Sequence, residues 1–228
     1  MITNRIKLIA SFVNSDVVAE VGADHGYITK YLFDTNKIEF AALTDISDKS
    51  LQKARDNFKN CKYSNQVCFA VGDGLQALTQ INDSVKNNKI EQIIIAGMGA
   101  KEIISILKQN KSYQNFVLQP QKNVVDLRKF LIQNNYRIKK DVMVKDGKIF
   151  YNVLQVVKNK FKTQKLTKRQ LMFGLSNIKS PNKDFCEYLN FKINQYSQIL
   201  KNSNSKQIQY KFLLIQKELD KINKKHVD

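Results

Sequence analysis

The chain has 228 residues, of which 43% are hydrophobic and 25% charged, a balance typical of a globular protein with one full core and an appendage. Lys and Arg number 38 against 20 Asp and Glu, so the formal net charge is +18. The longest apolar run, residues 93–99, falls well short of the ~20 residues of a membrane helix, and we expect no membrane partner.

The cysteines and histidines indicate the compartment and the metal chemistry. Cys61, Cys68 and Cys186 are odd in number and widely spaced, which favours reduced thiols over a disulfide framework. The first residues lack the apolar segment and cleavage site of a secretory signal. Both observations lead us to expect a cytoplasmic protein. Because His25 and His226 are the two histidines and there is no CxxC pair, we also expect no metal site.

Two explanations of the positive charge remain open. A pI of 9.7 indicates a polyanionic partner such as a nucleic acid, but AT-rich coding also enriches a sequence in Lys, Asn and Ile. The charge is concentrated towards one end. Residues 158–228 hold 16 Lys or Arg and 5 Asp or Glu, against 22 and 15 in residues 1–157. This distribution predicts a basic C-terminal appendage.

In the first 157 residues, short apolar runs alternate with helical patterns. Strands separated by helices require right-handed crossovers and a parallel sheet, whereas the last two strands flank Asp146-Gly147, a hairpin turn signal. The pattern predicts an α/β, Rossmann-like sheet of seven mostly parallel strands that ends in an antiparallel hairpin, as in class I methyltransferases. We predict strands at 17–21, 40–45, 67–71, 90–96, 115–119, 137–144 and 149–157, and helices at 5–13, 27–33, from Ser47 onward, 75–81, 101–109 and 124–134.

After residue 157 the pattern changes. Residues 158–168 are polar and basic, typical of a linker, and residues 183–200 and 206–224 carry apolar side chains at helical spacing on either side of a polar turn. We therefore expect two domains, 1–157 and 158–228, the second a helical hairpin zipped as a short coiled coil. Its lysines either contact RNA or form the solvated face of a packing or dimerisation element.

The ends of the first two predicted strands carry candidate ligand-binding residues. In the loop E-V-G-A-D-H-G, Gly22 and Gly26 would let a ligand approach the backbone at a helix N-terminus, although such loops are often structural. Asp45 ends the second strand, where a carboxylate can accept hydrogen bonds from both ribose hydroxyls. The alternative is that Asp45 caps the helix that begins near Ser47.

Two further strand ends extend this constellation. Asp73 in V-G-D-G-L could accept a hydrogen bond from an adenine amino group, or serve as a turn residue. Gly97 and Met98 in I-I-I-A-G-M-G-A could line the space beside a reactive group, or form a plain strand-to-helix turn. The carboxyl ends of parallel strands share one edge, so we expect all four segments to converge there.

The acidic residues favour a cationic cofactor. Glu20 suits an ammonium and a sulfonium, and Asp24 would repel a pyrophosphate. The loop also departs from the GxGxxG pattern of dinucleotide sites. S-adenosylmethionine is therefore favoured over NAD.

Several segments together resemble the tRNA adenine-22-N1-methyltransferase family over essentially the whole chain. The resemblance implies a class I fold that binds S-adenosylmethionine, methyl transfer to N1 of an adenine, and a C-terminal helical domain that helps hold tRNA. It rests on V-A-E-V-G-A-D-H-G-Y-I, V-G-D-G-L, I-I-I-A-G-M-G-A, L-Q-P-Q-K-N-V-V-D-L-R-K-F-L-I-Q-N-N-Y and the basic C-terminal hairpin.

The resemblance also implies roles for individual residues. Family members often have Ser and Ala where this chain has Ala23 and Gly26, a Glu near Asp45, and Asn at the position of Asp73; these departures keep polar acceptors at both acidic positions. By motif matching, Glu20, Gly22, Asp24, His25 and Tyr27 fall on the first cofactor loop, Asp45 with Ile46 on the ribose position, Asp73 and Gly74 on the adenine position, and Gly97 and Met98 beside the methyl group.

N1 lies on the Watson–Crick edge, so the adenine must be unstacked before attack, and positioning can supply most of the acceleration without a metal. Our catalytic candidates are Asp24, His25 and Tyr27, with Tyr27 able to stack on the base. A helix-start histidine bonded to backbone is the alternative for His25. Gln119 and Pro120 end the fifth strand and would shape the substrate pocket, unless they form a plain turn.

Other functions on the same fold remain open. The chain could methylate another RNA or a small molecule, or be a non-catalytic RNA-binding module. Residues 97–100 stand where exocyclic adenine N6 methylases have Asn-Pro-Pro-Tyr, which favours a ring nitrogen as acceptor. The oligomeric state does not follow from the sequence, and we expect a monomer.

Overall fold

The computed structural model describes residues 2–81, 89–159 and 164–224, and its centre is a seven-stranded sheet of order β3-β2-β1-β4-β5-β7-β6. Strands β1 to β5 are mutually parallel where they pair, and β7 runs antiparallel to both β5 and β6. This confirms the predicted fold class. The strands are β1 (Val17–Val21), β2 (Phe40–Asp45), β3 (Val67–Val71), β4 (Gln92–Met98), β5 (Asn115–Pro120), β6 (Tyr136–Asp146) and β7 (Ile149–Lys158).

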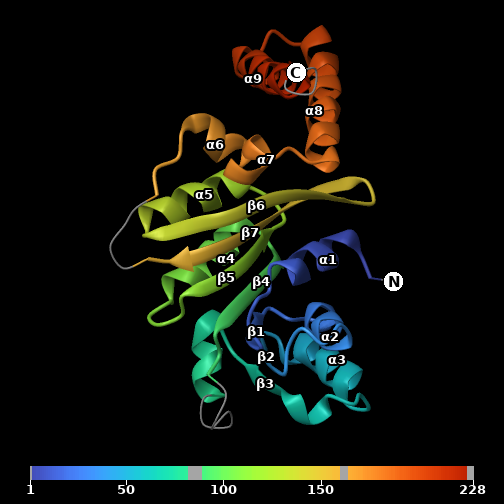
Figure 1. Ribbon diagram of the computed structural model, residues 1–228, viewed down its shortest axis with the longest axis vertical. Helices are drawn as coiled ribbons and strands as arrows, with labels where there is room; N and C mark the ends of the chain where they lie inside the picture. Colours follow the sequence, from blue (N-terminus) through green and yellow to red (C-terminus); the bar gives the residue numbers. More distant parts are fainter. Residues whose placement is uncertain (1, 82–88, 160–163, 225–228) are drawn as a thin grey trace.

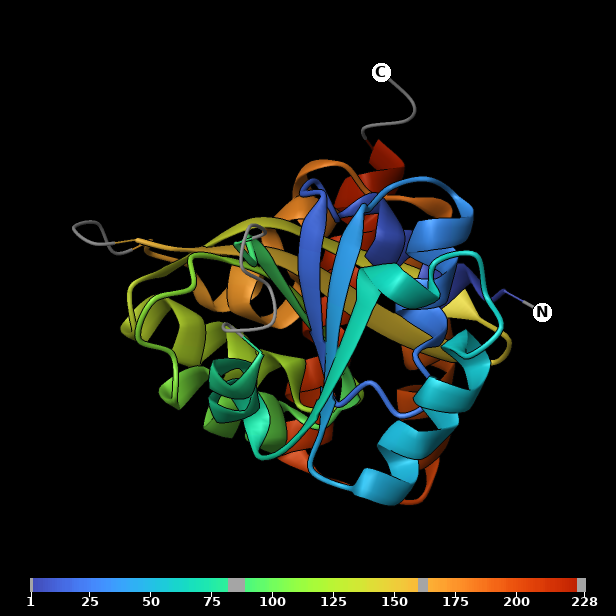
Figure 2. The same ribbon diagram turned by 90° about the horizontal axis from the view of Figure 1, so that it is seen from below.

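Helices cover both faces of the sheet (Figure 2). One face packs against α1 (Asn4–Ser11), α2 (Tyr27–Asp34) and α3 (Asp48–Phe58), and the other against the 3-10 helix η2 (Gly74–Gln80), α4 (Ala100–Lys108) and α5 (Val124–Gln133). The inner strands are buried on both faces, which is why they read as continuous apolar runs. The edge strand β6 instead alternates over residues 136–139.

Parallel strands place all their carboxyl ends at one edge, and the loops there lead into the next helices. Gly26 begins α2 with φ of 68°, a left-handed conformation that glycine adopts without strain. Ser47 begins α3, and its side chain accepts the N–H of Ser50, as predicted. The strand-end residues singled out in the sequence therefore belong to loops that share one edge of the sheet.

Two expectations differ from the structure along the chain. Residues 74–80 form a 3-10 helix instead of an α-helix. The predicted boundary at 157/158 falls inside β7, which continues to Lys158. Part of the expected linker, residues 160–163, lies outside the described residues, and the linker is followed by two short helices that the sequence pattern did not predict, α6 (Lys168–Phe173) and α7 (Leu175–Lys179).

Helices α6 and α7 join the C-terminal part firmly to the sheet. The Asn177 side chain accepts the N–H of Met143 in β6, and the Ser176 hydroxyl accepts the N–H of Asp141. Beyond them, α8 (Lys183–Lys201) and α9 (Lys206–Lys224) form a hairpin at one end of the molecule, far from β3 (Figure 1). Phe185 and Leu189 of α8 are buried in the cluster that also contains Ile215, Leu219 and Ile222 of α9. The start of α8 thus packs on the end of α9; coiled-coil packing stays a prediction.

Candidate active site

A cavity of about 290 Å³ opens at the carboxyl ends of β1 to β4. Its volume is near the lower limit of small-molecule sites. Six of the predicted cofactor-binding residues line it together: Gly22, Asp45, Ile46, Asp73, Gly74 and Met98. The remaining lining residues are Val21, Gly72, Glu102, Ser105 and Ile106.

Asp45 is fixed in this cavity by two backbone donors. Its Oδ2 accepts the N–H of Asp24 at 3.2 Å, and its Oδ1 accepts the N–H of Ser47 at 2.9 Å. A carboxylate has about four acceptor positions, so each oxygen can accept one further hydrogen bond. That pair of oxygens matches the two vicinal hydroxyls of a ribose. Capping and ligand binding are therefore compatible roles for this residue.

Ile46 and Asp73 provide an apolar surface and a polar group for a flat ring. Ile46 is 72% exposed although it lines the cavity, so a bound ligand would remove apolar surface from water. Asp73 Oδ2 accepts a hydrogen bond of 3.0 Å from Gln109 Nε2. Gln109 Oε1 in turn accepts the N–H of Leu75, which holds the loop around Gly74 in place.

Gly22 and Met98, which both line the cavity, are in close contact. Gly22 has φ of 73°, and a Cβ at this position would overlap the Met98 methyl group. The positive φ and the close approach both require glycine. Met98 therefore contacts the first cofactor loop directly, and its place beside the methyl group stays a prediction.

Glu20 does not line the cavity. It is 4% exposed, and its Oε2 accepts hydrogen bonds from the backbone N–H and the hydroxyl of Thr29 in α2. Burial raises the pKa of this carboxyl group to about 7, against the lowering effects of Thr29 and of the charge on Arg5. In this conformation Glu20 anchors the start of α2, and direct cofactor contact by Glu20 stays a prediction.

The three catalytic candidates lie where the first cofactor loop enters α2, with Asp24 and His25 in the loop and Tyr27 as the first helical residue, and none of them lines the cavity. The rings of His25 and Tyr27 are stacked, with centroids 4.9 Å apart and planes inclined by 4°. Asp24 Oδ1 accepts from Lys53 Nζ at 3.1 Å, and its Oδ2 lies 3.8 Å from His25 Nε2. The His25 backbone carbonyl accepts a hydrogen bond from Asn57. Because Tyr27 is 52% exposed, this stack offers an aromatic surface to solvent.

Gln119 and Pro120 lie where β5 ends, and Gln119 is completely buried. The Gln119 Oε1 accepts from the N–H of Gly97 at 3.2 Å and from Arg5 Nη1 at 2.9 Å, while Nε2 donates to the Pro120 carbonyl. The Gln119 side chain thus braces neighbouring residues. A role of Gln119 and Pro120 in shaping the substrate pocket stays a prediction.

Helix α4 contributes three residues to the cavity that were not predicted from the sequence. Glu102, Ser105 and Ile106 line the cavity from the first turns of this helix. Their i, i+3, i+4 spacing places them on one helix face directly after the A-G-M-G segment. This spacing is the feature of the sequence from which the contribution of α4 to the cavity could have been predicted.

Neither a metal site nor a membrane helix is found among the described residues. No group of three His, Cys, Asp or Glu side chains there could hold a metal ion. Within the same ranges, no helix is both long and apolar enough to cross a membrane.

The residues present fit S-adenosylmethionine. Asp45 presents paired acceptors that would suit a ribose, and Ile46 and Asp73 line the same cavity, where they would flank an adenine ring. The strand order, with β7 inserted antiparallel between β5 and β6, distinguishes this sheet from all-parallel dinucleotide-binding sheets. Fold and site together define a class I methyltransferase.

Comparison with known proteins gives the family. Residues 18–224 match the family described as TrmK, tRNA (adenine(22)-N(1))-methyltransferase, and the chain belongs to this family. It is accordingly an S-adenosylmethionine-dependent tRNA (adenine-N1)-methyltransferase.

Individual relatives agree with this assignment. A Mycoplasma genitalium protein with the provisional name of a tRNA methyltransferase is 37% identical over 174 residues, 75% of this chain and 76% of that protein. The Bacillus subtilis tRNA (adenine(22)-N(1))-methyltransferase is 26% identical over 67% of this chain and 63% of its own.

Solved structures agree as well. The M. capricolum TrmK, solved with S-adenosyl-homocysteine, is 28% identical over 98% of this chain and 97% of its own, with a TM-score of 0.73. Streptococcus pneumoniae Sp1610 shares the fold with a TM-score of 0.85 at 23% identity, over 96% of this chain and 100% of its own.

Proposed function

We propose that the cavity at the carboxyl edge binds S-adenosylmethionine and that the loop with Asp24, His25 and Tyr27 receives adenine 22 of a tRNA. When bound, the cofactor supplies an electrophilic methyl group on a sulfonium. The observation that carries the proposal is the double anchoring of Asp45 within a cavity that Asp73 and Met98 also line. The Bacillus relative bears the name of the adenine-22 enzyme, which gives the target nucleotide.

The chain's own residues would act mainly by positioning. Asp45 and Asp73 hold the donor, and the exposed face of Tyr27 stacks on an adenine that has left its helical stack. Methylation at N1 makes the adenine cationic, and loss of an N6 proton returns it to the neutral form. His25, beside the Asp24 carboxylate, is our proposed acceptor of that proton.

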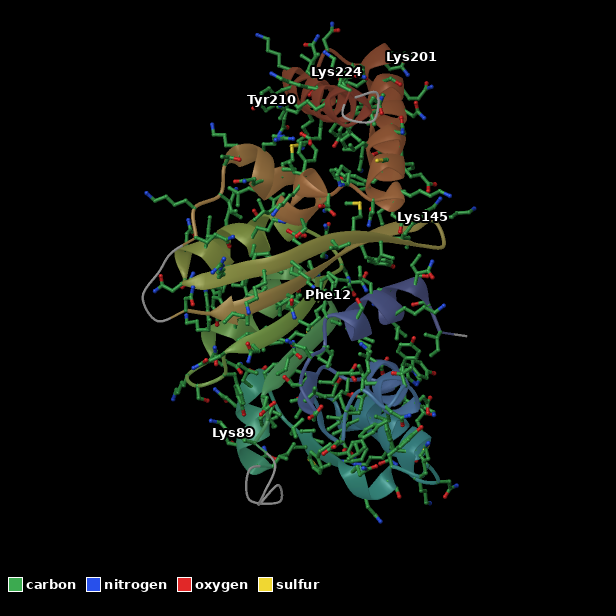
Figure 3. All side chains as sticks on the ribbon, in the orientation of Figure 1. Phe12, Lys89, Lys145, Lys201, Tyr210 and Lys224 are labelled. Carbon is green, nitrogen blue, oxygen red and sulfur yellow. The ribbon has the colours of Figure 1, made fainter. Side chains whose placement is uncertain are left out.

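The C-terminal part, residues 158–228, would contact the tRNA backbone. Its excess of 16 Lys or Arg over 5 Asp or Glu supports this proposal. Within the hairpin, burial, and next the charge of Lys211 on α9, lower the pKa of Lys192 on α8. Two lysines that repel each other in the free protein are stabilised by a polyanion. Lys201, Tyr210 and Lys224 lie on the same hairpin, at the end of the molecule opposite Lys89 (Figure 3). We propose that a single copy of the chain, in the cytoplasm, suffices for binding.

The test compares two tRNA transcripts that differ at one nucleotide. Purified protein is incubated with labelled S-adenosylmethionine and either a tRNA with adenine at position 22 or its guanine-22 variant, and nucleosides are analysed. We expect 1-methyladenosine in the first transcript alone. Methylation at another nucleotide would support the alternative of a different RNA methyltransferase, and binding without incorporation would support a non-catalytic RNA-binding module.

A further inference from the structure

Arg5 of helix α1 is held rigidly beside the proposed active site. Its Nη1 donates to Gln119 Oε1 at 2.9 Å, and its guanidinium carbon lies 5.5 Å from the centre of the Tyr151 ring. Gln119 is itself completely buried and fixed by Gly97 and Pro120. The guanidinium group is therefore positioned before any ligand arrives.

The position of this group is next to the cavity. A Cβ at Gly97 would lie 3.9 Å from Arg5 Nη1, so the guanidinium faces the end of β4. Gly97 directly precedes Met98, which lines the cavity. Arg5 itself does not line the cavity; its guanidinium lies beside Gly97, one position before Met98 on the same strand.

The charge of Arg5 has no ion-pair partner in the described part of the chain. Arg55, Arg128 and Arg169 are each paired with a carboxylate, and Arg137 is exposed. Arg5, by contrast, is half-buried, and its hydrogen-bond partner is a neutral amide. Four of its five N–H donors find no acceptor among the described residues.

The nearest acidic influence on Arg5 is weak. Glu20 interacts electrostatically with Arg5, but burial raises the pKa of Glu20 to about 7, so its carboxyl group is largely neutral below that pH. A half-buried guanidinium that keeps most of its donors free is stabilised by an oxyanion, which accepts two parallel hydrogen bonds.

We propose that Arg5 forms a preorganised oxyanion subsite of the substrate complex, an inference that rests on the proposed function. The oxyanion is either the α-carboxylate of the bound methyl donor or a phosphate of the target nucleotide, and both present the same chemistry to the guanidinium. Arg5 precedes residues 18–224, which match the family, so the family match does not assign it a role.

The test uses the variant Arg5→Gln and two nucleoside ligands. S-adenosylhomocysteine carries the α-carboxylate and 5′-methylthioadenosine lacks the whole amino-acid part, and both affinities are measured by calorimetry. If the carboxylate is the ligand, Arg5→Gln weakens S-adenosylhomocysteine binding at least tenfold and leaves 5′-methylthioadenosine binding unchanged. Lys7→Gln is the matched control, because it removes one exposed charge from the same helix.

If a phosphate is the ligand, both nucleosides bind Arg5→Gln normally, but tRNA affinity falls. The slope of log K against log salt then decreases in magnitude by about 0.7–0.9, the value for one phosphate contact. Unchanged nucleoside and tRNA binding would overturn the inference and leave Arg5 as a structural brace.

A second variant, Arg5→Lys, keeps the test valid if Arg5→Gln is destabilised. Methyl incorporation by the wild type separately tests the proposed function. Should Arg5→Gln melt at a lower temperature, Arg5→Lys is used instead, which keeps the charge but loses the planar fork; we expect the same ligand to be weakened, to a smaller extent. Because these assays measure binding alone, absent methyl incorporation by the wild type would contradict the proposed function without deciding the role of Arg5.

Discussion

Arg128 of α5 and Asp141 of β6 form a bidentate ion pair with both side chains 1% exposed, with distances of 2.6 Å from Nε and 2.9 Å from Nη2. Arg128 Nη1 also donates to the carbonyls of Leu171 and Met172 in α6. The pair therefore connects the methyltransferase sheet to the C-terminal part. Deleting residues 158–228 would remove these two acceptors, so surface substitutions test RNA binding more cleanly than truncation.

Breaking this pair should destabilise the whole protein. Arg128→Met leaves the Asp141 charge buried without its partner, and we expect the free energy of unfolding to fall by about 3–5 kcal/mol. Chemical denaturation measures it. Lys129→Met, on the exposed side of the same helix, is the control and should change stability by less than about 0.5 kcal/mol. A similar small effect of Arg128→Met would contradict the connecting role.

Asp45 should determine cofactor affinity. Asp45→Asn removes the charge and one of the two acceptors that we assign to the ribose, so we expect the affinity for S-adenosylmethionine to fall about tenfold or more. Calorimetry on the folded variant measures this loss. The matched control is Asp56→Asn on the exposed surface of α3, for which binding should stay at the wild-type value. Equal affinities for all three proteins would place the donor elsewhere.

Glu20 should make stability depend on pH. The folded-state pKa of about 7 lies above the ordinary value of 4.5, so the folded protein binds an extra proton between these values. The associated stabilisation is complete below pH 4.5 and is lost as the pH rises through 7. Glu20→Gln removes this dependence while keeping an acceptor for Thr29.

We therefore expect Glu20→Gln to gain stability relative to the wild type between pH 5 and pH 8, by at most about 3 kcal/mol. Urea unfolding at both pH values gives the difference. Glu91→Gln, at an exposed position, should show no such gain. Parallel pH profiles for wild type and Glu20→Gln would show that the Glu20 carboxyl is ionised in the folded state throughout this range.

Substituting Lys192 and Lys211 should weaken tRNA binding without destabilising the fold. Replacing both by Gln removes a repulsion between α8 and α9, so thermal stability should be equal or slightly higher. The tRNA affinity should fall, with a smaller salt dependence, because two phosphate contacts are lost. Filter binding at several salt concentrations measures both. Lys108→Gln with Lys111→Gln, near the end of α4, is the matched double control. Unchanged tRNA binding would favour a packing or dimerisation role for the hairpin.

The sequence predicted the sheet and the cofactor cavity because both depend on local patterns. Strand ends such as Asp45 and Asp73 follow apolar runs directly, and parallel pairing brings them to one edge without further information. Ser47 was recognisable as a helix cap for the same local reason. Six predicted residues share the cavity as a result.

Roles that depend on long-range packing could not be predicted. The acidic character of Glu20 suggested a cofactor ligand, but its orientation towards Thr29 depends on how α2 packs on the sheet. Gln119 reads as a pocket residue until its bonds to Arg5 and Gly97 are known. Helices α6 and α7 are short and lie in a basic stretch, so the periodicity that identified the longer helices was absent.

The residue that ends helix α1 is joined to strands that lie much further along the chain. The carbonyl of Phe12 accepts hydrogen bonds from Gln92 of β4 and from Gln155 of β7, the second across 143 positions of the chain. During synthesis, the hydrogen bond from Gln155 can form only after β7 has left the ribosome, whereas the packing of α1 on α2 needs only residues that are made early. A nascent chain stalled before Tyr151 would lack the ring that lies under the Arg5 guanidinium, so Arg5 would reach its final place only once β7 has been made.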